Sequence, residues 1–129
     1  MKLIFLPIIK FPFAAFGRIW LPYWFKPLHP VRKEGILRHE LEHLAQQRRV
    51  GVWCYLWRYF TQRDFRRKME LEAYGVEIAH LAAAWGGLNE VWIGYFAGEI
   101  SRRGYPYFGM MSRLEAEEWV LKEVLNWKR

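Results

Sequence analysis

The segment from Val31 to Val50 constrains this chain more than any other, because its apolar residues recur at helical spacing. Those residues are Ile36, Leu37, Leu41 and Leu44. Pro30 suits the first turn of a helix, and Gly51 suits the position after its last turn. We therefore predict a helix of roughly five turns. His39 and His43 lie near its middle, and residues four apart share one helical face, so both imidazoles point to the same side.

Glu40 completes the pattern His-Glu-x-x-His over residues 39–43. With this spacing a helix presents two imidazoles to a zinc ion and one carboxylate to the water on that ion. Glu40 is rotated away from the two histidines and would reach the water, not the metal. Catalytic zinc takes three protein ligands and keeps one position for water. The pattern predicts Zn²⁺ bound by His39, His43 and a third residue, with Glu40 as general base.

The third ligand must come from another element, and a second predicted helix, from about Phe65 to Trp85, carries the candidates. They are Glu70, Glu72, Glu77 and His80. Glu70 and Glu72 lie about 200° apart around a helix, so they cannot both face the metal. Glu72 and Glu77 are also poorly aligned, whereas Glu70 and Tyr74 share a face. Helical phase favours Glu70 and leaves Glu72 as the alternative.

Glu70-Leu71-Glu72-Ala73-Tyr74 resembles the Glu-x-x-Ala-Asp element that follows His-Glu-x-x-His in gluzincin metallopeptidases such as the CAAX prenyl protease group. In that element the first Glu ligates zinc, the Ala lets two helices pack closely, and the Asp orients a histidine. The resemblance implies that Glu70 is a zinc ligand. The chain departs from the element at Tyr74, which can still hydrogen-bond an imidazole or an oxyanion.

The string from His39 to Gln47 is also similar to the His-Glu-Leu-x-His-x-x-Gln-Gln run of small zincin-like domains in bacterial and phage toxin or injection-system proteins. Together the two resemblances cover residues 31–74. They imply a minimal zincin-like domain and a zinc metallopeptidase that hydrolyses peptide bonds in a peptide or protein substrate. In this chemistry Glu40 takes a proton from the zinc-activated water and passes it to the leaving amine.

The tetrahedral oxyanion of such a reaction needs a hydrogen-bond donor. Four side chains could supply it: Tyr74, which we prefer slightly, and His80, Tyr105 and Tyr107. Aromatic packing is the competing role for each tyrosine. Tyr74 is therefore the second catalytic candidate beside Glu40.

Two other functions stay open. The first is a non-catalytic zincin-fold structural or binding module, such as a virion or injection-particle component. The chain has a surplus of aromatic residues: eight Trp, seven Tyr and nine Phe. Several Trp and Tyr must be partly exposed, and exposed aromatic side chains would suit protein assembly. The second is nucleic-acid binding through Arg48, Arg49, Arg63, Arg66, Arg67 and Lys68. It is the least favoured, because no recognised nucleic-acid motif accompanies these charges.

The composition limits the remaining choices. The net charge of +7 favours acidic partners, including anionic membrane surfaces. Cys54 is the only cysteine, which excludes an internal disulfide and a cysteine-based zinc site. Its apolar neighbours predict that it is a buried small hydrophobe.

The first thirty residues are apolar but do not form a targeting segment. Lysine or arginine interrupts them every eight residues, and five prolines break them further. We predict neither a signal peptide nor a transmembrane helix, and a cytoplasmic or virion-associated location. Lys2 to Ile9 and Arg18 to Phe25 are compatible with extended structure or a hairpin, and peripheral contact with a membrane interface is a minor alternative.

We predict a single domain over residues 1–129 that is mainly α (α+β) and compact. Residues 1–30 form an aromatic N-terminal arm, 31–87 the metal-site helices and 88–129 the C-terminal helices. Val52 to Phe60 is helical or extended. Asn89 suits the N-cap of a helix, and Ser112 to Glu115 forms a capping box for the last one. The expected core stripe of that last helix is Leu114, Trp119, Val120, Val124 and Trp127.

Overall fold

The fold is mainly α with a small sheet, as predicted. The computed structural model describes residues 2–103, 107 and 109–127. In these residues the helices are α1 (Pro30–Val50), α2 (Val52–Thr61), α3 (Arg63–Trp85), α4 (Glu90–Ile100) and α5 (Arg113–Trp127). The strands are β1 (Lys2–Phe5), β2 (Phe13–Ala15) and β3 (Arg18–Leu21), and a short 3₁₀ helix covers Tyr23–Phe25. None of the described helices is both long and apolar enough to cross a membrane.

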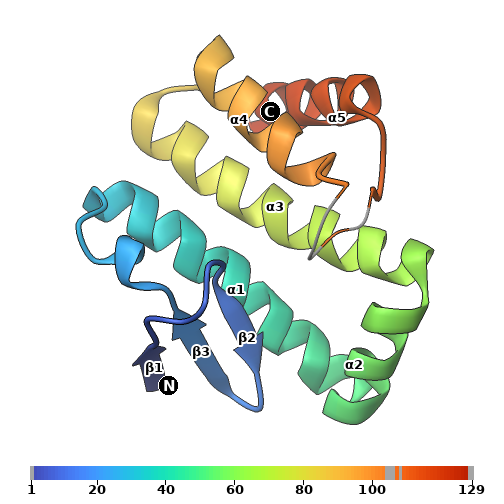
Figure 1. Cartoon of the computed structure of the whole chain (residues 1–129). Helices are drawn as coiled ribbons and strands as arrows, with labels where there is room; N and C mark the ends of the chain where they lie inside the picture. The colour runs from blue at the N-terminus through green and yellow to red at the C-terminus, as the bar shows by residue number, and fades with distance from the viewer. Residues whose placement is uncertain (1, 104–106, 108, 128–129) are drawn as a thin grey trace.

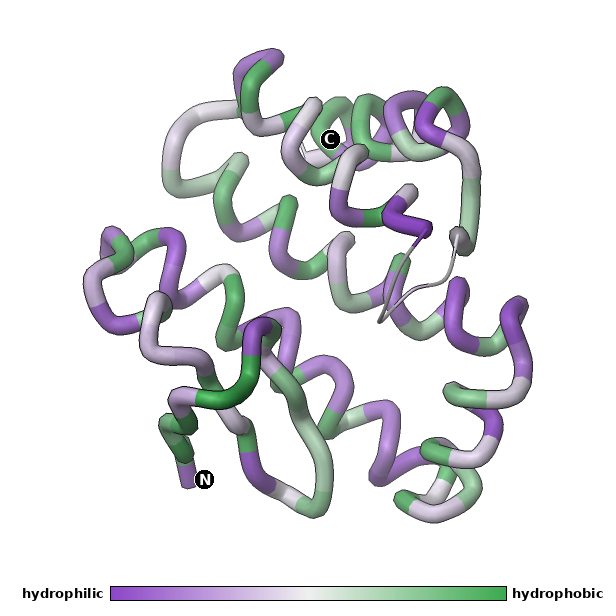
Figure 2. Tube along the Cα trace, viewed as in Figure 1, coloured by the Kyte–Doolittle hydropathy of each residue, from purple (hydrophilic) through white to green (hydrophobic). Residues whose placement is uncertain are grey.

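The elements are stacked in layers, with the sheet on one side of α1 and α3 on the other (Figure 1). α1 and α3 run antiparallel, and α4 and α5 cover the far side of α3. α2 joins the end of α1 to the start of α3. Hydrophobic and hydrophilic residues alternate along α1 and α3, as expected for helices with one face in the core (Figure 2).

The N-terminal arm forms the three-stranded sheet, with β3 in the centre. β1 pairs with β3 in parallel, and β2 and β3 form a hairpin. Phe16 and Gly17 make the turn, and both have positive φ, as a tight hairpin turn requires. The Gln47 side-chain amide donates a 2.7 Å hydrogen bond to the Ala14 carbonyl. This bond fixes the inner edge of the sheet on α1.

The ends of the helices follow the signals in the sequence. His29 caps α1, because its Nδ1 accepts a hydrogen bond from the Val31 amide. Gly51 and Gly86 end α1 and α3 with positive φ, which glycine adopts without a steric penalty. Asn89 caps α4 through its side chain, and the capping box of α5 forms as predicted, with Ser112 Oγ accepting from the Glu115 amide. The ambiguous segment after Gly51 is helical.

Two burial predictions were wrong. Val120 of the predicted stripe of α5 is buried, and Trp119 and Val124 are partly buried against the core, but Leu114 is exposed and Ala116 is buried in its place. Residues 114 and 116 lie about 200° apart on a helix, so the face that buries Ala116 turns Leu114 to solvent. Cys54 is also exposed, because α2 buries the face that carries Tyr55. Apolar neighbours in the sequence do not determine which face of a short helix is buried.

The largest core cluster lies between α3, α4 and α5, with Phe96 completely buried at its centre. Phe96→Ala should lower the free energy of unfolding by about 3–5 kcal/mol, because it removes buried apolar contacts and leaves a cavity. Urea denaturation followed by circular dichroism measures the change. The exposed Val91 on the same helix provides the control, and Val91→Ala should change stability by no more than about 0.5 kcal/mol. Equal effects of both substitutions would contradict this account of the core.

Candidate metal centre

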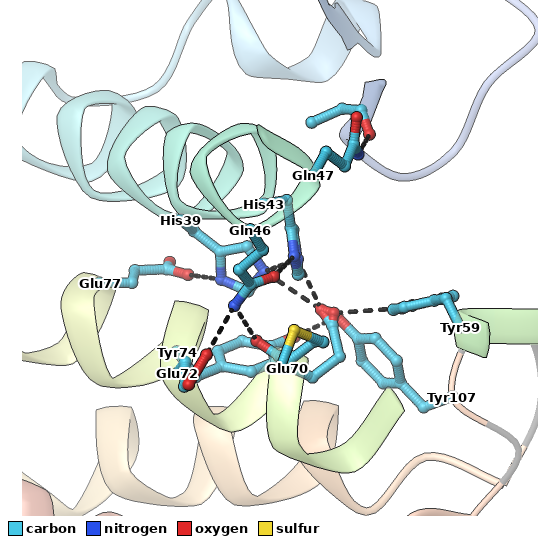
Figure 3. Close-up of polar contacts among 12 residues, drawn as sticks. His39, His43, Gln46, Gln47, Tyr59, Glu70, Glu72, Tyr74, Glu77 and Tyr107 are labelled. Atoms are coloured by element: carbon cyan, nitrogen blue, oxygen red, sulfur yellow. Dashed lines mark hydrogen bonds and ion pairs between the residues drawn. The ribbon is translucent and has the colours of Figure 1, made fainter. Parts of the chain in front are cut away.

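His39, His43 and Glu70 meet in the buried interface between α1 and α3 (Figure 3). The Nε2 atoms of the two histidines are 3.2 Å apart. Oε1 of Glu70 lies 2.9 Å from Nε2 of His43 and 3.4 Å from Nε2 of His39. Three potential ligand atoms from two helices therefore surround one point.

The four candidates for the third ligand lie at different positions relative to the two histidines. Glu70 alone joins the two histidines in a group of potential ligands among the described residues. Glu72 turns outward, where it accepts a hydrogen bond from Gln46 and lies 3.7 Å from Arg49. Glu77 lies behind His39, on the ring nitrogen that faces away from Glu70. His80 lies outside the group, and its Nε2 is buried without a hydrogen-bond partner among the described residues.

The spacing of the three atoms fits a tetrahedral zinc ion. Ligand atoms about 2.0–2.1 Å from such an ion are about 3.3–3.4 Å apart. The observed separations of 2.9, 3.2 and 3.4 Å are close to that value. Two imidazoles and one carboxylate also form a ligand set used in zinc hydrolases, with the fourth position left for water.

Each histidine is oriented by a partner on its other ring nitrogen. Nδ1 of His39 lies 2.9 Å from Oε1 of Glu77. Nδ1 of His43 lies 3.0 Å from Oε1 of Gln46. When Nδ1 carries the proton and donates it to these oxygens, Nε2 presents its lone pair to the shared point, and this is how metal-binding histidines are commonly held. Tyr55 reinforces the second contact, because its hydroxyl lies 3.0 Å from both Nδ1 of His43 and Oε1 of Gln46.

Glu77 is itself anchored by a cation. Arg32 donates to its second carboxylate oxygen at 2.5 Å and to the hydroxyl of Tyr95 at 2.6 Å. The guanidinium also lies over the rings of Tyr95 and Trp92. A chain of contacts thus runs from the surface of α4 through Arg32 and Glu77 to the buried His39, which restricts the rotation of the imidazole.

The electrostatics of the cluster favour a positive charge at its centre. Burial raises the pKa of the Glu70 carboxyl, but His43 and His39 outweigh that effect and hold it well below its usual range. Burial lowers the pKa of His39, yet hydrogen bonds to Glu70 and Glu77 raise it well above the ordinary value. The pKa of His43 is raised in the same way, because the charge of Glu70 outweighs burial. A divalent cation would compete with protons for these nitrogens.

Glu40 lies beside the cluster and outside the ligand group. Its side chain is buried, and it lines the same cavity as both histidines and Glu70. Burial is the main cause that raises the pKa of its carboxyl. A carboxylate whose charged form is destabilised in this way is a better proton acceptor than one in water.

The predicted oxyanion donors have different surroundings. Tyr74 and Tyr107 are both buried, their hydroxyls are 2.6 Å apart, and both residues line the cavity. The ring of Tyr74 also packs edge-on against His39, with ring centroids 4.4 Å apart. His80 does not line the cavity, and Tyr105 lies outside the described residues.

Tyr59 is a hydroxyl that the sequence analysis did not identify. It comes from α2, lines the cavity and donates a 3.2 Å hydrogen bond to Oε2 of Glu70. Burial, followed by the charge of Glu70, raises the pKa of Tyr59 well above its ordinary value, so the phenol keeps its proton. Nothing in the local sequence indicates this role, because it depends on how α2 packs against α3.

The supporting role of Glu77 was also missed, since the residue was weighed only as a ligand. A signal for it exists in the sequence. Glu70, Tyr74 and Glu77 are spaced four and three residues apart and therefore share one face of α3. All three contact the histidines of α1.

The cavity above the cluster has a volume of about 740 Å³. Its polar floor is formed by the residues described above, and most of its walls are apolar. The loop after β1 and helix α2 supply much of this apolar lining: Leu6, Ile8, Ile9, Phe11, Leu56 and Phe60. A polar, titratable floor under apolar walls is the usual composition of a binding site for an organic ligand.

The assignment of a function to this site rests on its geometry and chemistry. Comparisons of the chain with protein-family models, with characterised proteins and with solved structures gave no match.

Proposed function

We propose that this protein is a minimal zincin-like, zinc-dependent metallopeptidase, in which His39, His43 and Glu70 hold Zn²⁺ and Glu40 is the general base. One observation carries the proposal. Two imidazole nitrogens and a carboxylate oxygen lie 2.9 to 3.4 Å apart, at the bottom of a cavity that Glu40 also lines. The likeness of residues 39–47 and 70–74 to gluzincin and zincin-like motifs supports the same conclusion.

Each residue of the site has a separate role in the proposed peptide hydrolysis. Zinc held by the three ligands would polarise a peptide carbonyl and lower the pKa of water to about 7. Glu40 then accepts the proton of the attacking water and delivers it to the nitrogen of the leaving amine. The Tyr74 hydroxyl is the proposed donor to the oxyanion, with the neighbouring Tyr107 hydroxyl to orient it. Tyr59 holds Glu70 in position through its hydrogen bond.

The cavity fits a peptide substrate with apolar side chains. A volume of about 740 Å³ lies within the usual range for ligand sites and can enclose several side chains. Three cationic side chains line the cavity: Arg32 and Arg102 are paired with Glu77 and Glu99, and Lys10 is exposed. Substrate selection is therefore proposed to come from apolar contacts and not from a charged group.

Cleavage of a fluorogenic peptide library by the zinc-loaded protein tests the proposal. Activity should disappear when a chelator removes the metal and return on addition of Zn²⁺. Circular dichroism before and after chelation must show that the helices remain. Cleavage that continues in metal-free protein would contradict the proposal.

Glu77→Gln tests the support of the metal centre. Loss of the carboxylate charge removes the strong partner of His39 Nδ1 and leaves Arg32 without its ion pair. We expect zinc affinity to fall by about 10–100-fold, as when other outer partners of metal ligands are replaced. Competition with a chromophoric chelator measures it. Asp64→Asn on the same helix removes an exposed carboxylate outside the ligand group and should leave the affinity unchanged.

A non-catalytic zincin-fold binding module is the second candidate. It is favoured by large aromatic side chains on α2 that point away from the cavity, including Trp53 and Trp57. Such a protein would bind zinc with the same residues and cleave no member of the peptide library. The metal content and the cleavage assay together distinguish the two candidates.

A further inference from the structure

Arg66 belongs to the basic run from Arg63 to Lys68, but its side chain does not point to solvent. It is only 7% exposed, whereas Arg63 and Lys68 are exposed. Arg66, Glu70 and Tyr74 are spaced four residues apart, so they share one face of α3. Arg66 therefore lies one turn before Glu70, on the face of α3 that contributes to the metal site, and not on a surface that a nucleic acid could contact.

The guanidinium of Arg66 binds the backbone of two segments that are far apart in the chain. Its Nη1 donates a 2.8 Å hydrogen bond to the carbonyl of Tyr59, in the last turn of α2. The last four carbonyls of a helix have no donor within the helix, so this bond also caps α2. Its Nε donates a 3.3 Å hydrogen bond to the carbonyl of Tyr107, between α4 and α5. The fork of one guanidinium thus holds both segments.

Each of these segments contributes one phenol to the metal site. The Tyr59 hydroxyl donates a 3.2 Å hydrogen bond to Oε2 of Glu70 (Figure 3). The Tyr107 hydroxyl lies 2.6 Å from the hydroxyl of Tyr74. Both phenols line the cavity, and Arg66 does not. Any effect of Arg66 on a substrate in the cavity must therefore pass through other residues.

We propose that Arg66 is a positioning residue of the metal site, which places the phenols of Tyr59 and Tyr107 by holding the backbone of both residues. Under the proposed function, on which this role rests, Tyr59 holds the ligand Glu70 and Tyr107 orients the oxyanion donor Tyr74. Groups of a working site must be held to within about 0.5 Å of their productive geometry. A phenol hydroxyl is the far end of a rigid ring, so a small rotation of the backbone displaces it by more than the backbone moves.

The alternative is that Arg66 only stabilises the fold, and Arg63 provides the comparison for that role. Arg63 lies one turn earlier on α3, and its Nη2 donates a 3.2 Å hydrogen bond to the carbonyl of Met110, also between α4 and α5. Met110 is buried in the core and does not line the cavity. The two arginines thus make the same kind of bond to the same connection, but the residue that Arg63 holds contributes no group to the site.

Zinc affinity, measured by competition with a chromophoric chelator, tests the link through Tyr59. Arg66→Met keeps an apolar side chain and removes the guanidinium, and it should lower the affinity by about tenfold, as should Tyr59→Phe. In the Tyr59→Phe background, Arg66→Met should lower the affinity by less than about twofold further, because the bond that Arg66 supports is already lost. Arg63→Met is the matched control and should bind zinc like the wild type.

Cleavage of a fluorogenic peptide at saturating zinc tests the link through Tyr107. Arg66→Met should lower kcat by about tenfold and change KM by less than about twofold, because an oxyanion donor acts in the transition state. In the Tyr107→Phe background the further loss of kcat should be less than about twofold. Arg66→Lys keeps the charge but replaces the fork by a single nitrogen, so it should change both quantities in the same direction. It provides the second variant if Arg66→Met does not fold.

NMR of the chain labelled with ¹³C-tyrosine tests the positioning without metal or substrate. The ring signals of Tyr59 and Tyr107 should shift in metal-free Arg66→Met and stay in place in Arg63→Met. A wild type that binds no zinc would refute the proposed function, and the ring signals would then decide on Arg66 alone. Unshifted ring signals would overturn the role of Arg66. So would losses that add in full to those of Tyr59→Phe and Tyr107→Phe, or equal losses in Arg63→Met.

Discussion

His43→Ala should abolish the stoichiometric zinc binding that we expect of the wild type, about one ion per chain, with a loss of affinity greater than about 100-fold. The substitution removes one of three ligand atoms that lie within 4.8 Å of one another. It leaves Gln46 and Tyr55 hydrogen-bonded to each other, so the neighbouring packing keeps its polar contacts. Metal analysis by mass spectrometry, after dialysis against a weak chelator, gives the stoichiometry.

His80→Ala is the control for this experiment. His80 is the fourth histidine-or-glutamate candidate on α3, but it lies outside the ligand group. Its substitution should leave the zinc content at the wild-type value. Zinc retained by His43→Ala, or lost from His80→Ala, would show that the metal is bound elsewhere. Circular dichroism of both variants excludes loss of metal through unfolding.

Glu40→Gln should lower the rate of peptide cleavage by about 10²–10⁴-fold and leave the zinc content unchanged. The amide has nearly the same shape as the carboxylate but cannot accept the proton of the attacking water. Glu40 is outside the ligand group, so the metal should stay bound. The measurement combines initial cleavage rates at saturating zinc with metal analysis of the same sample.

Glu42→Gln provides the matched control on the same helix. Glu42 lies two residues away and contacts Arg49 at the surface at 3.6 Å. Its variant should cleave peptides at the wild-type rate. Full activity in Glu40→Gln would exclude Glu40 as the base. Zinc binding without cleavage in the wild type would favour the non-catalytic module.

The sequence predicts the local parts of this structure because they depend on neighbours along the chain. Helical spacing brings His39 and His43 to one face, and Gly51, Gly86 and Asn89 mark helix ends through backbone conformation and capping. The same phase argument selects Glu70 over Glu72, and the structure places Glu70 at the histidines. These predictions need only the geometry of a single helix.

The contacts between elements depend on how the helices pack, which the periodicity of each helix leaves undetermined. The packing of α1 on α3 decides that Glu77 orients His39, and that of α2 decides that Tyr55 and Tyr59 reach His43 and Glu70. The outward side of α2, with Trp53, follows from the same packing. The sequence by itself thus predicted that the two histidines share a face and that Glu70, and not Glu72, lies against them. Only the tertiary structure decided which side chains contact these residues and which side of α2 is exposed. The reason is that the rotation and spacing of packed helices are set by contacts between residues that are far apart in the chain.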